Sequence, residues 1–345
     1  MGYSQSRRGQ LIVLLMIVIF ICAACGAGIS SKLDKPTQES AVINNPLANL
    51  QAIIDQYLKN TKHLYIEPHE VLSQIANGED DRYILVDIRN DEHYAFAHIP
   101  GAIHISYSDT WREQKLNYLP KDKKIIVIDY SGHTASQVAA TWNMLGFEAV
   151  PMRYGMAGWS TNREVIGGSP KSCAAYNFPV VTTTSETGSY DTPELATKAA
   201  SVSELFIARA EGAVKIAPVI QSQDLKDKLQ SYFIIDTRQS EHFARGHLEG
   251  AINIPFESIA ETASLKKIPP DKNLILVCYD GHASSQAARA LNLLGYHATA
   301  LKDGMSAWVA DEKIIGSKPI ACDVDEKPVM KLNALLKPGP STGAT

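Results

Sequence analysis

The stretch "CYDGHASSQAA" at residues 278–288 decides the fold prediction, because the chain contains an earlier copy of it. "DYSGHTASQVA" stands at residues 129–139, so the offset from 129 to 278 is 149 residues. Flanking segments keep this offset without a gap: "VDIRNDEHYAFAHIPGAIHI" from residue 86 matches "IDTRQSEHFARGHLEGAINI" from residue 235. An internal repeat of this length indicates two copies of one domain.

Each copy alternates short apolar runs with helical patterns. "YILVDIR" and "KIIVID" in the first copy correspond to "YFIIDTR" and "NLILVC" in the second, and all four have strand length. The helical patterns that follow the repeated loop end at Gly146 and Gly295. Helices are also expected at the start of each copy, over Leu47–Leu58 and near Val202–Phe206. The fold class is therefore α/β: two repeated domains, each a mostly parallel sheet with helices on both faces.

The N-terminus has the features of an export signal. Arg7 and Arg8 precede the apolar run "LIVLLMIVIFICAACG", which ends at small residues and Cys25. This ending resembles a bacterial lipobox with Cys25 as the lipidation site, although Cys22 replaces the usual Leu. A lipid anchor in the bacterial cell envelope, on the extracytoplasmic side of a membrane, is the favoured prediction; a cleaved signal and an uncleaved anchor are the alternatives.

The expected organisation follows from the repeat and the composition of its flanks. The segments are a signal at 1–25, a polar tether at 26–46, a first domain at 47–178, a linker at 179–198, a second domain at 199–325 and a flexible tail at 326–345. The formal net charge of -4 and the absence of basic blocks argue against a nucleic-acid partner. No H-x3-H or C-x2-C pair occurs at ligand spacing in the mature chain, so no metal and no cofactor are expected.

Cys278 follows a buried strand and precedes a helix, with Gly281 allowing the turn between them. Such a loop directs backbone N–H groups and the positive end of the helix dipole at one point. The expected anion cradle comprises Tyr279, Asp280, Gly281, His282, Ala283 and Ser284. A thiol in this cradle is expected to ionise more easily, to act as a nucleophile and to hold a charged persulfide.

Asp129 takes the place of the cysteine in the first copy. Its carboxylate can accept the N–H groups meant for a bound anion, but it cannot attack sulfur. The first copy is therefore expected to be an inactive, structural half. A role for Asp129 as an acid or base toward the other site is the alternative.

These residues give the chain its resemblance to tandem rhodanese-like proteins, over roughly 66–165 and 216–312. The matching features are the Asp-x-Arg strand ends with a downstream Glu, the "AHIPGAIHI" and "GHLEGAINI" segments, C-x-x-G in the loop, and a closing Gly-Met-x-x-Trp. The resemblance implies transfer of sulfane sulfur through a cysteine persulfide, here on Cys278. It also implies that in tandem members one copy commonly lacks the cysteine. Residues at matching positions with an expected structural role are Asp236, Arg238, Glu241 and His247; Arg89 and Arg238 are expected to tie the sheet end to Glu92 or Glu241.

The loop departs from the family pattern C-R-x-G-x-R. Tyr279 and Ala283 stand where the basic residues are usual, and Asp280 adds an acidic group. A lost charge-assisted hydrogen bond costs about 1–3 kcal/mol, so weak activity toward thiosulfate is expected. His282 could restore positive charge if protonated. The first downstream Arg is Arg289, a turn into the helix, which argues against a Cys-dependent phosphatase.

Cys173 and Cys322 occupy equivalent positions in the two copies. A disulfide between them, two independent thiols, and exchange between Cys278 and Cys322 remain the three interpretations.

The favoured function is an envelope-anchored sulfurtransferase or persulfide carrier. Its expected partners are a small sulfur donor or a protein persulfide or thiol, together with the membrane through the N-terminal lipid or anchor. The alternative is a non-catalytic rhodanese-like binding or scaffolding module, favoured by Asp280 and by the missing loop Arg.

Overall fold

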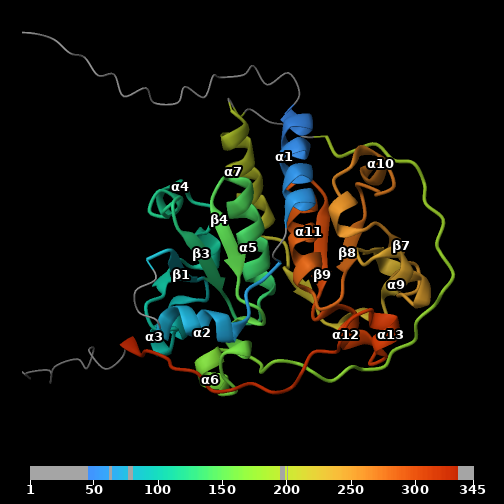
Figure 1. The fold of residues 1–345 in the computed structure, drawn as a ribbon. Coiled ribbons are helices and arrows are strands. Elements are labelled where there is room, and N and C mark those ends of the chain that lie inside the picture. Colours follow the sequence, from blue (N-terminus) through green and yellow to red (C-terminus); the bar gives the residue numbers. More distant parts are fainter. Residues whose placement is uncertain (1–45, 62–63, 77–80, 195–198, 200, 333–345) are drawn as a thin grey trace, which may run out of the picture. The chain divides into compact units, whose positions relative to one another are not determined.

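The computed structural model describes residues 46–61, 64–76, 81–194, 199 and 201–332 (Figure 1). The predicted signal, the lipidation site at Cys25, most of the tether and the end of the tail lie outside the described residues. Within the described part of the chain, no helix combines the length and apolar character needed to cross a membrane.

The first repeat is built on a parallel four-stranded sheet in the order β2-β1-β3-β4. Its strands are β1 (Tyr83–Asp87), β2 (Ile103–His104), β3 (Lys124–Ile128) and β4 (Glu148–Pro151). Its helices are α1 (Pro46–Asn60), α2 (Pro68–Ala76), α3 (Asp91–Phe96), α4 (Glu113–Leu116), α5 (His133–Met144) and α6 (Arg163–Ile166), with 3-10 turns η1 (Tyr107–Asp109) and η2 (Gly155–Gly158).

The second repeat is built on a parallel five-stranded sheet in the order β5-β9-β8-β6-β7. Its strands are β5 (Val219–Ile220), β6 (Phe233–Asp236), β7 (Ile252–Asn253), β8 (Asn273–Val277) and β9 (His297–Leu301). Its helices are α7 (Val202–Ala213), α8 (Ser222–Leu225), α9 (Ser240–Arg245), α10 (Thr262–Leu265), α11 (His282–Leu293), α12 (Gly304–Trp308) and α13 (Glu312–Ile315), with 3-10 turns η3 (Leu229–Ser231) and η4 (Phe256–Ser258).

Both sheets are covered on both faces, which confirms the predicted fold class. Along β3, Ile126 and Ile128 belong to one buried cluster, whereas Ile125 and Val127 belong to another. Successive side chains of a strand point to opposite faces, so the apolar run forms part of two cores. Every residue of β8 after the first is buried in the same way.

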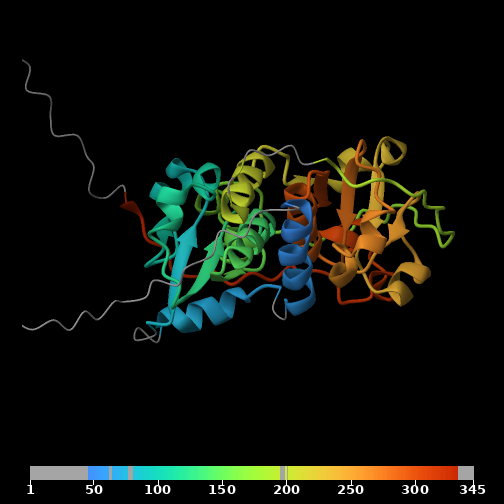
Figure 2. The same cartoon turned by 90° about the horizontal axis from the view of Figure 1, so that it is seen from above.

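The helix α1 packs on the second repeat rather than only on its own. Leu50, Ile54 and Leu58 are fully buried in the apolar cluster that contains Leu276 and Leu291 of the second repeat. The two views of the ribbon agree, with α1 beside α11 (Figures 1 and 2). Of the amphipathic face predicted over Leu47–Leu58, Leu50, Ile54 and Leu58 are therefore core residues shared between the repeats.

After its last helix, each repeat sends a strap across to the other repeat. The first strap (173–183) donates Phe178 N–H to Trp308 O at 2.9 Å, and Val181 forms an antiparallel bridge with His247. The second strap (322–332) donates Lys327 N–H to Trp159 O at 3.3 Å.

The second strap continues with an antiparallel bridge between Met330 and His98. The prediction of a flexible tail was wrong for residues 326–332, because these hydrogen bonds attach the second strap to the first repeat. The first part of the predicted linker is likewise attached, through Pro179 O, which accepts the indole N–H of Trp308.

Candidate active site

Cys278 lies at the carboxyl end of β8, where the chain turns into α11. Gly281 makes the turn at φ +89°, in the left-handed region that favours glycine. A Cβ at Gly281 would clash with the ring of His133 and crowd Asp303 N, both on neighbouring segments. Gly281 N–H donates to Cys278 Sγ at 3.1 Å. The strand, the turn and the helix N-terminus thus lie where the sequence predicted them.

The Cys278 thiol is buried, with 1 % of its surface exposed. Burial, followed by the nearby Asp280 carboxylate, raises the pKa of Cys278 to about 11. The expectation of an easily ionised thiolate was therefore wrong for this conformation. The hydrogen bonds from the loop favour the anion, but they do not compensate for the loss of solvent.

Asp129 shows what the same loop does with an anion. Its carboxylate accepts the N–H groups of Ser131 at 3.1 Å, Thr134 at 2.9 Å and Ala135 at 3.2 Å, and also that of Gly132. Burial nevertheless raises the pKa of Asp129 above its usual range, because desolvation outweighs these four donors. The loop and the first turn of α5 form the anion cradle that was inferred from the sequence.

The second loop has an arginine partner from the first repeat. Arg153 Nη2 lies 2.8 Å from Asp280 Oδ2, and Arg153 Nη1 lies 2.7 Å from Glu67 Oε1. Burial raises the pKa of Asp280, but His282 and Arg153 outweigh this effect and hold it below its usual range. The guanidinium that the loop itself lacks is thus supplied from 127 residues away, at a position that no local motif identifies.

Two buried histidines join the loops of the two repeats. The rings of His133 and His282 stack with centroids 5.2 Å apart. His282 Nε2 accepts Tyr154 N–H at 3.2 Å, and His133 Nε2 accepts Asp303 N–H at 3.0 Å. Burial, reinforced by His282, lowers the pKa of His133 well below its usual range. A neutral His133 keeps the lone pair that accepts Asp303 N–H.

The strand-end arginines have a structural role with a different partner from the one predicted. Arg238 is fully buried and pairs with Asp236 at 2.7 Å, while Glu241 is exposed and contacts His242. Arg89 pairs with Asp87 in the same way rather than with Glu92. Each arginine pairs with the aspartate two residues earlier, Asp87 or Asp236, because that aspartate is the last residue of the strand that precedes the arginine. These arginines also donate to backbone carbonyls, as Arg238 does to Gly246 O at 2.8 Å.

Three further residues singled out in the sequence, His247, Cys173 and Cys322, make contacts that hold the straps in place. His247 Nδ1 contacts Phe243 O at 2.8 Å and its Nε2 contacts Thr183 O at 3.1 Å, which ties α9 to the first strap. Cys173 and Cys322 form a disulfide between the two straps, and Cys278 is the free cysteine of the described residues. No cluster of three or more potential metal ligands occurs among the described residues.

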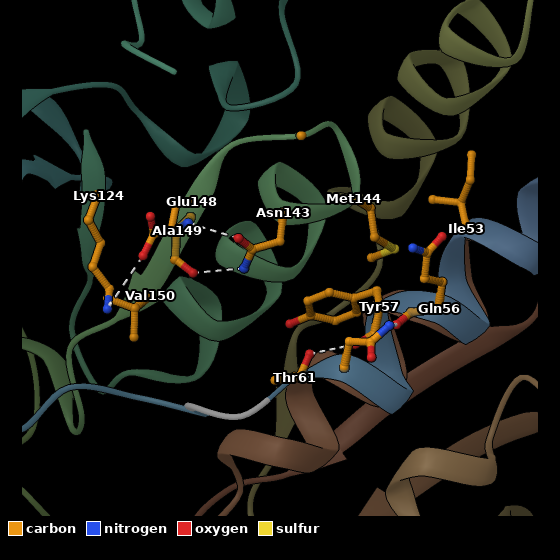
Figure 3. Close-up of a pocket in the computed structure, with 12 residues that line it drawn as sticks. Ile53, Gln56, Tyr57, Thr61, Lys124, Asn143, Met144, Glu148, Ala149 and Val150 are labelled. Carbon is orange, nitrogen blue, oxygen red and sulfur yellow. Dashed lines mark hydrogen bonds and ion pairs between the residues drawn. The ribbon is translucent and has the colours of Figure 1, made fainter. Parts of the chain in front are cut away.

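A cavity of about 550 Å³ lies between α1, α5 and β4, where Tyr57 and Met144 face it (Figure 3). No residue of the Cys278 loop lines this cavity. The candidate site is therefore the closed loop itself and the residues that the first repeat packs against it.

The comparisons with known proteins agree with the repeated domain. A family model described as "Rhodanese-like domain" matches residues 67–162 and 221–311. Thiosulfate sulfurtransferase GlpE of Shewanella oneidensis is 35% identical over 80 residues, which is 23% of this chain and 77% of the relative. Thiosulfate sulfurtransferase GlpE of Pseudomonas savastanoi pv. phaseolicola is 31% identical over 106 residues, 30% of this chain and 96% of the relative.

A solved structure of the rhodanese-like domain protein from Staphylococcus aureus is 25% identical, covering 28% of this chain and 90% of its own, with a TM-score of 0.26. The matches cover between 20% and 96% of the curated relatives' own length.

Proposed function

The chain belongs to the rhodanese-like domain family, and from this premise we propose that it is a sulfurtransferase or persulfide carrier that moves sulfane sulfur through Cys278. The donor is a small sulfur compound or a protein persulfide, and the acceptor is a thiol or another nucleophile. The Asp129 copy is the inactive counterpart in this proposal.

The geometry of Asp129 is the observation that carries the proposal. In a cysteine persulfide the terminal sulfur is two bonds from Cβ, as a carboxylate oxygen is in aspartate. The Asp129 carboxylate therefore stands in for a persulfide anion, and four backbone N–H groups bind it. At the repeat offset, their counterparts are the N–H groups of residues 280, 281, 283 and 284. These would stabilise the anion of a persulfide on Cys278.

The proposed transfer has two steps. The Cys278 thiolate attacks the outer sulfur of the donor, a new S–S bond forms, and the donor's S–S bond breaks with its electron pair leaving on sulfite or a thiolate. The acceptor then attacks the terminal sulfur of the persulfide, and Cys278 leaves as a thiolate. No net oxidant or reductant is needed, because each S–S bond that breaks is replaced by another bond to the moving sulfur.

In the proposed mechanism the first repeat must move before a donor can reach Cys278. The thiol is 1 % exposed, and its loop contacts the first repeat through His282 and Asp280. Separation of these contacts would readmit water, and the pKa of the thiol would fall toward the usual value of about 8.5.

The proposed location is the bacterial cell envelope, with an anchor at Cys25. The argument is the export-type segment around Arg7, Arg8 and the apolar run that follows. A disulfide between Cys173 and Cys322 is compatible with an oxidising compartment.

Sulfur loading of Cys278 tests the function. The chain is incubated with thiosulfate or a small organic persulfide, and the peptide that contains Cys278 is examined by mass spectrometry. We expect a gain of about 32 daltons, one sulfur atom, that cyanide or excess thiol reverses. The Cys278→Ser chain is the control. An unmodified Cys278 with both donors, under conditions that load a known rhodanese, would refute the proposal.

A binding module without turnover is the second candidate. The burial of Cys278 and its pKa of about 11 favour it, because an unreactive thiol serves no transfer step. The same loading experiment decides between the two functions.

A further inference from the structure

A second pocket, of about 320 Å³, lies where the second strap crosses the first repeat. We call it the basic pocket, because Arg153, Lys171, Lys318 and Lys327 line it. Three carboxylate residues also line it, and one of them, Glu67, is already paired with Arg153 at 2.7 Å. The pocket therefore gathers three lysines beside Arg153, the arginine that contacts the Cys278 loop.

The lysines of the basic pocket share it with the carboxylates of Asp323 and Asp325, and the hydrogen bonds of Lys171 and Lys327 go to backbone carbonyls. Lys171 Nζ donates to Asp323 O at 3.1 Å and Lys327 Nζ donates to Asp325 O at 2.8 Å, both backbone carbonyls. Within the described ranges, no carboxylate lies within ion-pair distance of Lys171, Lys318 or Lys327. Lys171 Nζ also lies 5.0 Å from the centroid of the Tyr154 ring, and Lys327 Nζ lies 5.9 Å from that of Trp159. Each ammonium group carries three donors, so each lysine has more donors than these hydrogen bonds use.

Arg153 also has an unused donor. Its Nη1 and Nη2 are paired with Glu67 and Asp280, whereas its Nε is buried and has no hydrogen-bond partner among the described residues. A buried N–H without an acceptor is costly. Burial lowers the pKa of Lys171; the Asp323 carboxylate raises it, and Arg153 and Lys327 lower it, so the net shift is downward. An anion in the pocket would be attracted by these cations, and one that reached Arg153 Nε would give that N–H an acceptor.

The other half of the molecule provides an internal comparison. At the repeat offset, the counterpart of Lys171 is the buried Ile320, and the counterpart of Lys327 is Phe178. Phe178 packs edge-on against Trp308 with centroids 5.0 Å apart and stacks on Tyr176. One strap thus fills its crossing with aromatic rings, while the other brings lysines to its crossing. At the first crossing Lys226 Nζ lies 5.7 Å from the centroid of the Phe178 ring, but the strap itself contributes no counterpart of Lys171 or Lys327 there.

We propose that the basic pocket binds a small inorganic oxyanion, of the class that includes thiosulfate, sulfite and sulfate, through Arg153, Lys171 and Lys327. Because Arg153 contacts both the pocket and Asp280, a bound oxyanion is held next to the Cys278 loop. The further role of the pocket, to collect an anionic donor or the anion that leaves, rests on the proposed function; the binding itself does not.

Calorimetry with the full chain carrying Cys278→Ser tests the binding. This variant cannot accept sulfur, so the result is independent of turnover. We expect one sulfate or thiosulfate per chain at low ionic strength, and an affinity about tenfold weaker in Lys171→Gln and in Lys327→Gln, since each removes one charge-assisted donor. Lys302→Gln, at the repeat counterpart of Arg153, is the matched control and should bind as before. The absence of saturable binding, or an equal loss with Lys302→Gln, would overturn the proposal.

Sulfur loading in the chain that retains Cys278 tests the role. Lys171→Gln should raise the thiosulfate concentration for half-maximal loading about tenfold and leave loading by an uncharged organic donor unchanged. An equal change for both donors would overturn the role as a donor site. If Cys278 takes no sulfur while sulfate still binds, the proposed function fails and the oxyanion site stands.

Discussion

Replacement of Asp280 by Asn should make the Cys278 thiol more acidic and more reactive. Burial is the largest cause of its raised pKa and the Asp280 carboxylate is the next. A pKa of about 11 leaves about 0.1% of the thiol ionised at pH 8, against about a quarter for an unperturbed cysteine. The native chain should therefore alkylate about 200-fold more slowly than an exposed thiol, before any steric shielding.

The assay is alkylation by iodoacetamide, an uncharged reagent, between pH 7 and about 12, so that the curve extends beyond the expected midpoint of about 11. Mass spectrometry of the peptide that contains Cys278 gives the rate at each pH, and the midpoint of the curve gives the pKa. Each unit by which Asp280→Asn lowers the midpoint should raise the rate at pH 8 tenfold. The same curve reports shielding separately, because shielding lowers the plateau rate without moving the midpoint.

Asp271→Asn is the matched control, since it removes an exposed carboxylate of the same repeat. It should leave the midpoint where it is. A midpoint at or below pH 8.5 in the native chain would refute the assignment of a raised pKa. A midpoint that Asp280→Asn does not move would refute the role of the carboxylate and leave burial as the cause.

Three further predictions concern stability. Cys173→Ser with Cys322→Ser opens a loop of 149 residues, and the chain-entropy model predicts a loss of about 5 kcal/mol in the free energy of unfolding; an unchanged urea midpoint would contradict it. Asp129→Ala leaves four buried N–H groups without their acceptor and should cost about 3 kcal/mol in the same assay, whereas equal stability would mean that water replaces the carboxylate. Burial raises the pKa of Asp303 to about 6, so the folded state binds its proton more tightly, and this contribution is present below pH 4 and lost as the pH rises through 6. Relative to Asp303→Asn, the native chain should lose about 3 kcal/mol of unfolding free energy across that window; parallel pH curves would refute it.

The sequence was sufficient to predict the strands, turns and helices that depend on a local residue pattern. Apolar runs of strand length, the turn at Gly281 and the helix that follows depend on residues close together in the chain. Because the repeat offset is constant, each element predicted in one copy is also predicted at the corresponding position of the other copy. Asp129 could be interpreted as an anion in the cradle because it stands at the strand end where the other loop has Cys278.

Contacts between the repeats could not be predicted from the same patterns. The amphipathic face of α1 showed that Leu50 and Ile54 would be buried, but not that the second repeat would bury them. The tail composition suggested disorder, whereas Trp159 and His98 fix it by backbone hydrogen bonds that any side chain permits. The local pattern around Cys278 predicted a thiol with a lowered pKa. Burial raises that pKa instead, and burial depends on residues distant in the sequence, which a local pattern does not reveal.

The asymmetry between two nearly symmetric loops gives the first repeat a specific role. The histidine contacts recur in both directions, so they explain why the repeats associate but not why one loop differs. The differences occur together: Cys278 in place of Asp129, Asp280 in place of Ser131, and an Arg153–Asp280 pair that has no counterpart. A carboxylate beside the thiol disfavours its ionisation, and Arg153 compensates for that charge from the other repeat. If the proposed function holds, the first repeat supplies no nucleophile, and its Arg153, paired with Asp280, is the residue through which it would influence the ionisation of Cys278.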